Sequence, residues 1–479
     1  MFFYSGIKAY HEQLLRNETD CLKTVQFYLS RIRDHSHLNA YLEIFEEESL
    51  QQASLLDQKR KAGAPMGKLH GVVISIKDVI CYKDHHVSAA SRMLEGFTSL
   101  YTASALQYLL DEEAIVIGRC NCDEFAMGST NENSAFGPVL NAINPNLVPG
   151  GSSGGSAVSV QADLCMAALG SDTGGSVRQP ADFCGIWGFK PGYGTFSRYG
   201  LIAYASSFDQ IGVLGKCMED ILLISSIMNR RDSFDATMNQ PSPFIPEKID
   251  GEEKTYRFCY FKQMIEHPSL DREIRQNLLS LFDELKSKGH IVEVSEFSLI
   301  DYIVPAYYLL TTAEASSNLS RYDGIRYGHR AEKADNLAEF YMQNRSEGFG
   351  REVKKRIMLG NFVLSAGYYD TYYAKAQKVR NLLCMQMAEI FKNFDAVLMP
   401  VSPSTAFPLG ENQNDPVAVY LADIFTVFAN LTGMPALALP RFTHSNGLPF
   451  GLQAMANRNQ EEKLFRIGAI LQNGKSKTD

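Results

Sequence analysis

The chain has 479 residues, of which 45% are hydrophobic and 21% charged, as expected for a globular protein with a large core. Its 46 Lys and Arg against 54 Asp and Glu give a net charge of −8, which argues against this chain alone gripping a nucleic-acid backbone. Nine scattered cysteines, no secretion-signal pattern and no apolar run of about 18 residues predict a cytoplasmic protein without a membrane partner.

The first elements are predicted from apolar spacing. A helix is expected after Asp20, where apolar residues recur on one helical face: Leu22, Val25, Leu29 and Ile32. A second helix is expected over residues 42–62, ending at Gly63. The runs GVVISIKD at 71–78 and AIVIG at 114–118 are rich in Val and Ile, which predicts buried strands.

The second half of the chain shows a strand–helix–strand pattern. A strand is expected at 257–261, then a helix with apolar positions from Ile274 to Leu285 that ends at Gly289, then a strand at 291–294. This alternation predicts an α/β fold. The polar, proline-containing stretch 230–254 is expected to be a surface loop or a module boundary.

The stretch PGGSSGGSAVSVQ, residues 149–161, is rich in glycine and serine. A flexible linker is a poor interpretation, because an apolar segment follows at once. A Walker-type phosphate loop would need Lys and then Ser or Thr where Ser156 and Ala157 stand, and the G-x-G-x-x-G pattern is also missing. The remaining interpretation is a tight turn that opens a helix near Ser156 and directs several N–H groups at one spot.

A second stretch of this kind, SDTGGSVRQP, occupies residues 171–180. The segment between the two is long enough for a helix and a strand, so both loops can meet at the end of a sheet where α/β proteins bind ligands. Serines there would need a base, and the ten histidines form no motif.

Lys77, at the end of the first predicted strand, is one candidate base, because desolvation lowers a lysine pKa by up to roughly 3–5 units. The alternative is a lysine that pairs with Asp78 or extends into water, and spacing alone favours it. Cys120 and Cys122 are interpreted as ordinary thiols rather than a metal site, because no second ligand pair accompanies them.

Three motifs together carry a resemblance: Lys77 with its strand, GGSSGGS at 150–156, and DTGGSVRQPADFCGIWGFKP at 172–191. In this order and spacing they resemble the amidase signature family. The segments DEFAMGSTNENSAFG, SRYGLIAYASSFDQIG, AEASSNLSRYDGIRYG and KKRIMLGNFVLSAGYYDTYY are similar to one branch of it, the A subunits of aspartyl/glutamyl-tRNA amidotransferases. The likeness covers nearly the whole chain.

The resemblance implies an α/β amidase signature fold, a central mixed β-sheet covered by helices on both faces. Residues 1–70 would be an N-terminal helical segment packed on the core, and residues 71–479 one catalytic domain.

The resemblance also implies roles for individual residues. Ser176 would be the nucleophile, Ser152 the bridging serine and Lys77 the base of a Ser–cis-Ser–Lys triad. Arg356 would bind the α-carboxylate of glutamine and Asp423 its α-ammonium group. The alternatives are a solvated helix position for Arg356 and a helix cap for Asp423. The oxyanion hole would be formed by the N–H groups of Thr173, Gly174, Gly175 and Ser176, and the substrate pocket would be completed by Gly128, Ser129 and Tyr307.

Some positions depart from the family's usual pattern: Val73 and Val79 in place of Pro and Asn, Asp182 in place of a small residue, and Gly192 in place of Thr. Trp187 is bulky for its place and is expected in the core. None of these residues belongs to the triad.

The implied activity is hydrolysis of glutamine through an acyl-enzyme. The ammonia would amidate Glu-tRNA(Gln), with Asp-tRNA(Asn) as a further acceptor. The chain itself would carry no cofactor. A B subunit would use ATP and Mg²⁺ and hold most of the tRNA, and a small C subunit would complete a heterotrimer. This division of labour suits an acidic catalytic chain.

Two other functions stay open at this point. A stand-alone amidase acting on another small amide would not need both Arg356 and Asp423. A scaffold without catalysis would not need Lys77, Ser152 and Ser176.

Overall fold

The computed structural model describes residues 2–238, 254–411 and 423–472. Its centre is an 11-stranded sheet in the order β1-β3-β2-β4-β6-β5-β10-β11-β9-β7-β8. The strands are β1 (Tyr41–Ile44), β2 (Val73–Lys77), β3 (Ile115–Cys120), β4 (Ala167–Asp172), β5 (Trp187–Lys190), β6 (Gln210–Gly215), β7 (Arg257–Phe261), β8 (Ile291–Ser295), β9 (Ala396–Pro400), β10 (Ala436–Thr443) and β11 (Pro449–Met455). The sheet is mixed: β2 runs parallel to β3 and β4, and β7 to β8 and β9, while the other pairs are antiparallel.

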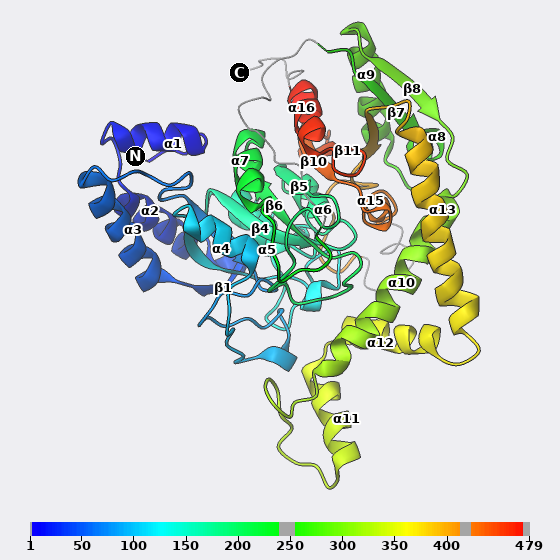
Figure 1. Cartoon of the computed structure of the whole chain (residues 1–479), viewed down its shortest axis with the longest axis horizontal. Helices are drawn as coiled ribbons and strands as arrows, with labels where there is room; N and C mark the ends of the chain where they lie inside the picture. The colour runs from blue at the N-terminus through cyan, green and yellow to red at the C-terminus, as the bar shows by residue number, and fades with distance from the viewer. Residues whose placement is uncertain (1, 239–253, 412–422, 473–479) are drawn as a thin grey trace.

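Helices flank this sheet, so the predicted α/β fold with a central mixed sheet is confirmed (Figure 1). They are α1 (Ile7–Leu15), α2 (Cys21–Asp34), α3 (Glu46–Lys61), α4 (Ser104–Asp111), α5 (Gly154–Gln161), α6 (Arg178–Phe183), α7 (Met218–Met228), α8 (Lys262–Ile265), α9 (Arg272–Ser287), α10 (Ile303–Asn318), α11 (Leu337–Gly348), α12 (Arg351–Leu364), α13 (Lys375–Ile390), α15 (Val427–Thr432) and α16 (Glu461–Gln472). The N-terminal helices and α10–α13 lie on opposite sides of the molecule, and α11 projects furthest from the sheet (Figure 1). No helix in the described ranges is long and apolar enough to span a membrane.

Most predicted elements are present. Helix α2 begins after Asp20, whose side chain accepts a hydrogen bond from Lys23 N (2.7 Å). The unit β7–α9–β8 is the expected strand–helix–strand motif, and its two strands are parallel. The predicted loop 230–254 is described only at its ends, since residues 239–253 lie outside the described ranges.

One boundary is wrong. The helix predicted for 42–62 begins only at Glu46, because residues 41–44 form strand β1. This strand pairs with β3, and Phe45 N extends the contact by donating to Ile117 O (2.9 Å). Strand β1 of the segment 1–70 pairs with β3 of the segment 71–479, so the two segments share one sheet. The division at residue 70 remains a prediction.

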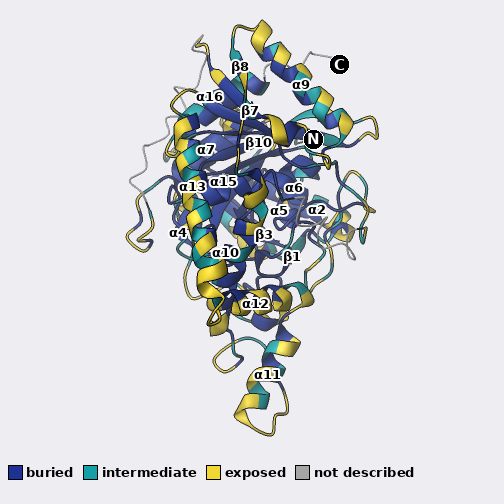
Figure 2. Ribbon diagram, turned by 90° about the vertical axis from the view of Figure 1, so that its right-hand side faces the viewer, coloured by how far each residue is buried: buried dark blue, intermediate teal, exposed yellow. Residues whose placement is uncertain are grey.

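The core lies along the sheet. Strands β2, β3 and β4 are buried throughout, as is Trp187 on β5, which is 3% exposed and confirms its predicted core position. Helices α9, α11 and α13 turn exposed faces outward (Figure 2). Lys77 stands at the end of one of these buried strands, and Arg356 stands on helix α12.

Candidate active site

Lys77 ends strand β2 and is fully buried. Its Nζ donates to three hydroxyl oxygens: Ser152 Oγ (2.7 Å), Ser171 Oγ (2.9 Å) and Ser153 Oγ (3.0 Å). The alternative that Lys77 pairs with Asp78 or extends into water is wrong, because Asp78 pairs with Arg119 (2.5 Å). Burial lowers the pKa of Lys77 to about 8, so a neutral amine is accessible near physiological pH.

The serines of the 150–156 stretch differ in whether their hydroxyl group already donates a hydrogen bond. Ser153 Oγ donates to Ser171 O (3.1 Å), and Ser156 Oγ donates to Leu169 O (3.0 Å), so each has committed its single proton. Within the described ranges Ser152 Oγ has only Lys77 as a partner, and the Gly151–Ser152 peptide bond is cis. Ser152 is thus the serine of the 150–156 stretch that can pass a proton to or from Lys77.

The two glycine-serine loops meet, as the sequence predicts. Helix α5 and strand β4 separate them, and Ser153 N donates to Ser176 O (3.1 Å) where they touch. Ser176 is 8% exposed and lines a cavity, and its Oγ has no hydrogen-bond partner in the part of the chain that the structure describes. Its hydroxyl is accessible to a bound molecule, whereas Ser152 is fully buried.

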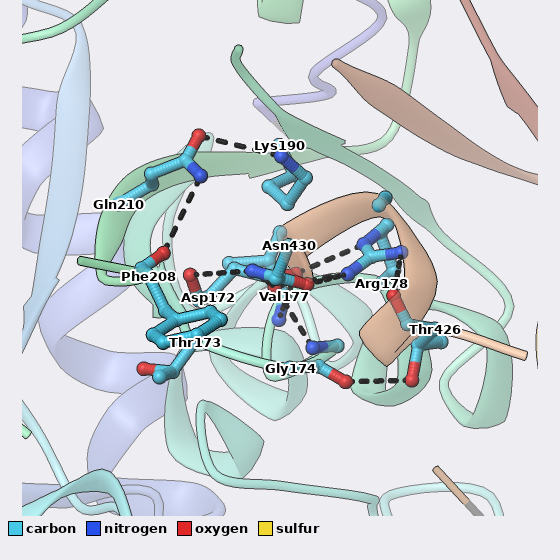
Figure 3. A network of polar contacts seen from close by, with 12 residues as sticks. Asp172, Thr173, Gly174, Val177, Arg178, Lys190, Phe208, Gln210, Thr426 and Asn430 are labelled. Atoms are coloured by element: carbon cyan, nitrogen blue, oxygen red, sulfur yellow. Dashed lines mark hydrogen bonds and ion pairs between the residues drawn. The ribbon is translucent and has the colours of Figure 1, made fainter. Parts of the chain in front are cut away.

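Asp172 and Arg178 hold the second loop, and sequence reasoning did not identify them. Arg178 Nε and Nη2 each donate to the Asp172 carboxylate at 3.0 Å, and both residues are fully buried (Figure 3). Arg178 also donates to Thr426 O (2.9 Å) and Asn430 Oδ1 (2.7 Å), which ties the loop to α15. Burial would raise the pKa of Asp172, but the charge of Arg178 prevails and lowers it to about 2.

The backbone donors of this loop differ from one another. Gly175 N donates to Asp172 Oδ1 (2.8 Å), so this predicted oxyanion donor is committed to a carboxylate in the structure. Among the described residues the N–H groups of Thr173, Gly174 and Ser176 have no hydrogen-bond partner. These three N–H groups are therefore free to bind an oxygen of a ligand.

A small cavity brings most of the predicted pocket residues together. Its lining is formed by Ala126, Gly128, Gly151, Gly174, Gly175, Ser176, Tyr204, Tyr307, Arg356 and Asp423. The predicted Ser129 is not among these residues. Tyr204 was not predicted, because no local pattern distinguishes it.

Arg356 and Asp423 bring opposite charges to this cavity. Arg356 is 6% exposed on α12, and its Nε donates to Glu352 Oε1 (2.9 Å) and its Nη1 to Tyr204 OH (2.9 Å). The alternative that Arg356 is a solvated helix residue is therefore wrong. The side chain of Asp423 accepts from Tyr308 OH (2.6 Å) rather than capping a helix, and burial raises its pKa to about 6.

Cys120 and Cys122 are both buried, and burial raises the pKa of each thiol. Residues 2–238, 254–411 and 423–472 contain no cluster of His, Cys, Asp and Glu that could hold a metal ion.

Comparison with known proteins identifies the family of this chain. Residues 23–465 match the Amidase family. The A subunit of the glutamyl-tRNA(Gln) amidotransferase from Chlorobium luteolum is 48% identical over 471 residues, 98% of this chain and 97% of the relative. Its counterpart from Prosthecochloris aestuarii is 45% identical over 472 residues, 98% of this chain and 99% of the relative.

Solved structures of two relatives have a similar fold. The crystal structure of the A subunit of the glutamyl-tRNA(Gln) amidotransferase from Thermotoga maritima superposes with a TM-score of 0.79 at 37% identity, covering 96% of this chain and 94% of that one. The peptide amidase of Stenotrophomonas maltophilia gives a TM-score of 0.80 at 26% identity, with 98% and 96% covered.

Proposed function

Because the chain belongs to the amidase signature family, we propose that it releases ammonia from glutamine as the A subunit of an amidotransferase for Glu-tRNA(Gln). The single observation that carries the proposal is the buried contact between Lys77 Nζ and Ser152 Oγ, 2.7 Å long, behind a cavity with an arginine and an aspartate on its wall.

We assign the proton route to Lys77, Ser152 and Ser176, and the contact between Lys77 Nζ and Ser152 Oγ supports its first step. Neutral Lys77 accepts the hydroxyl proton of Ser152, which in turn accepts that of Ser176. Ser176 Oγ attacks the carboxamide carbon of glutamine, the tetrahedral intermediate collapses, and ammonia leaves with the returned proton. Water then cleaves the glutamyl ester, giving glutamate and free Ser176. The low pKa of Lys77 supports this assignment, because the base must be neutral to accept a proton.

Oxyanion binding is assigned to the loop between β4 and α6. The N–H groups of Thr173, Gly174 and Ser176 are proposed as donors to the developing charge, since preorganised N–H groups act strongly in a site with little water. Gly175 was expected to take part as well, but its N–H group would first have to leave Asp172 Oδ1.

Substrate choice is assigned to the charges on the wall. Arg356 would bind the α-carboxylate of glutamine and Asp423 its α-ammonium group, with Tyr307, Gly128 and the adjacent Ser129 shaping the pocket. A stand-alone amidase for uncharged amides would gain nothing from burying both charges. We therefore propose glutamine, rather than another small amide, as the substrate.

The partners are proposed from the relatives' name, which marks them as one subunit of a larger enzyme. A B subunit would bind ATP, Mg²⁺ and most of the tRNA, and a small C subunit would complete the heterotrimer. The net charge of −8 fits this division, because a phosphate backbone is held by clustered positive charge. Asp-tRNA(Asn) is a further proposed acceptor.

The test is ammonia release from glutamine by the chain co-expressed with the B and C subunits of its own organism, beside Ser176→Ala. The wild type is expected to release ammonia at least about 10³-fold faster than the variant, because the alanine lacks the attacking oxygen. Misacylated tRNA and ATP, added next, should convert that ammonia into amidated tRNA. Equal release by both proteins would contradict the proposal and direct attention to other amides or to a scaffold.

A further inference from the structure

Glu124 is a buried carboxylate outside the proton route. It is 2% exposed and forms no ion pair among the described residues, although the charge of Lys354 acts on it. It accepts hydrogen bonds from Ser91 Oγ to Oε1 (2.5 Å) and from Gly350 N to Oε2 (2.8 Å) and Oε1 (3.1 Å). Burying a carboxylate costs free energy, and burial raises the pKa of Glu124 to about 7. The position of this carboxylate therefore needs an explanation.

One end of the contact is the cavity wall. Glu124 directly follows Asp123, which accepts hydrogen bonds from Asn131 N (2.9 Å) and Asn133 N (3.1 Å). A Cβ atom at Gly128 or at Gly151 would collide with the Asp123 carboxylate, so this carboxylate packs directly behind the lining of the cavity.

The other end of the contact is the helix that carries Arg356. Gly350 is the N-cap of α12, six residues before Arg356, and it offers no side chain to cap the helix. The first N–H groups of a helix lack partners within it, and a negative charge at that end is favourable. The Glu124 carboxylate fills this place, and a Cβ at Gly350 would collide with it.

Other charged groups surround the contact without replacing it. Arg92, Glu347 and Lys354 line the groove beside Glu124 and Gly350. Glu347 pairs with His329 (2.8 Å), and Lys354 donates to Ser346 O (2.9 Å). Neither of these two side chains bonds to Gly350 N, so Glu124 is the group that joins the cavity wall to the start of α12.

We propose that Glu124 is a positioning residue for substrate recognition: it holds the start of α12 against the cavity wall and so places Arg356 for the α-carboxylate of glutamine. This inference rests on the proposed glutaminase function. The carboxylate contact exists before and during the reaction, so its loss should raise KM more than it lowers kcat.

The experiment uses the complex with its partner subunits and compares wild type, Glu124→Gln and Glu347→Gln. Glu347→Gln removes a carboxylate from the same groove but not from Gly350, which makes it the matched control. Glu124→Gln should raise the KM for glutamine about tenfold and change kcat by less than about threefold, whereas Glu347→Gln should leave both unchanged within about twofold.

A second readout separates positioning from general damage to the pocket. 4-Aminobutanamide has the amide and amine of glutamine but no α-carboxylate, so its inhibition constant against glutamine should change by less than about twofold in Glu124→Gln. Equal weakening of both compounds, or an unchanged KM for glutamine, would overturn the inference.

Two further outcomes are separable. If Glu124→Gln does not fold, Ser91→Ala supplies the test, because it removes one hydrogen bond to Glu124 and should raise the KM for glutamine by about two- to threefold; an unchanged KM would again overturn the inference. A wild-type complex that releases no ammonia from glutamine would count against the proposed function itself.

Discussion

Lys77 is the residue on which the chemistry depends. A lysine in water stays protonated at neutral pH, with a pKa of about 10.4, and could not serve as a base. Full burial among hydroxyl groups lowers its pKa to about 8. Sequence spacing could not decide between a buried base and a solvent-exposed lysine, because burial depends on strands that lie far apart in the chain.

This environment predicts a pH profile. Because only neutral Lys77 accepts a proton, kcat/KM for glutamine should rise as pH passes through about 8, until at higher pH the α-ammonium group of glutamine loses the charge that Asp423 would bind. Initial rates of ammonia release between about pH 6 and pH 10 check this, with Lys77→Arg as the control, whose guanidinium stays charged throughout and should be inactive. A wild-type profile already flat from pH 6 would contradict the assignment.

Other site residues show the limit of reading a sequence. Lys77, Ser152, Ser176, Arg356 and Asp423 were assigned roles through motifs and family resemblance, and the fold brings them together. Ser176, Arg356 and Asp423 line one cavity, and the buried Ser152 accepts a hydrogen bond from Lys77.

Tyr204 and Glu124 could not be predicted in the same way. The partner of Tyr204 lies 152 positions away at Arg356, and that of Glu124 lies 226 positions away at Gly350. Such pairs follow from tertiary packing, which single-sequence periodicity does not contain.

At the scale of elements, prediction succeeded where the signal is local. The capped helix α2, the Val- and Ile-rich strand β2 and the unit β7–α9–β8 have strong internal patterns. Strand β1 failed because its four residues owe their conformation to pairing with β3, more than 70 positions later.

The loop between β4 and α6 owes its shape to a buried ion pair, which gives a second prediction. Arg178→Met should destabilise the protein by about 3–5 kcal/mol and reduce ammonia release, because Asp172 would remain buried without its partner. Thermal unfolding and glutaminase assays measure both effects. Arg16→Met is a suitable control, since its ion pair with Glu12 is exposed and should matter little. Equal stability of both variants would show that the pair does not hold the loop.

At the scale of the whole molecule, one departure from the family pattern predicts a stability change with pH. Asp182 is buried and accepts from Gly451 N (2.6 Å), and burial raises its pKa to about 7. The folded state therefore binds more protons than the unfolded state between about pH 4 and pH 7, so the contribution of Asp182 to stability falls as pH rises through this range.

Asp182→Asn keeps the acceptor for Gly451 N and removes the charge. It should raise the unfolding free energy on the order of 2 kcal/mol at pH 8, with a smaller gain at pH 5. Thermal midpoints at both pH values test this, with the exposed Asp335→Asn as control. A gain in unfolding free energy that is equal at both pH values, or a loss at pH 8, would show that the buried charge of Asp182 does not destabilise the folded state.

The site is assembled from segments that lie far apart in the chain. Lys77 comes from β2, Ser152 and Ser176 from loops around α5 and β4, Arg356 from α12, and Asp423 from the segment before α15. The central claim is that these parts convert glutamine into an ester on one serine. The most direct measurement is mass spectrometry of the complex quenched during turnover with glutamine, followed by peptide mapping. We predict a glutamyl adduct on the peptide that contains Ser176, absent in Ser176→Ala; an adduct on another residue, or an adduct that persists in Ser176→Ala, would contradict the account.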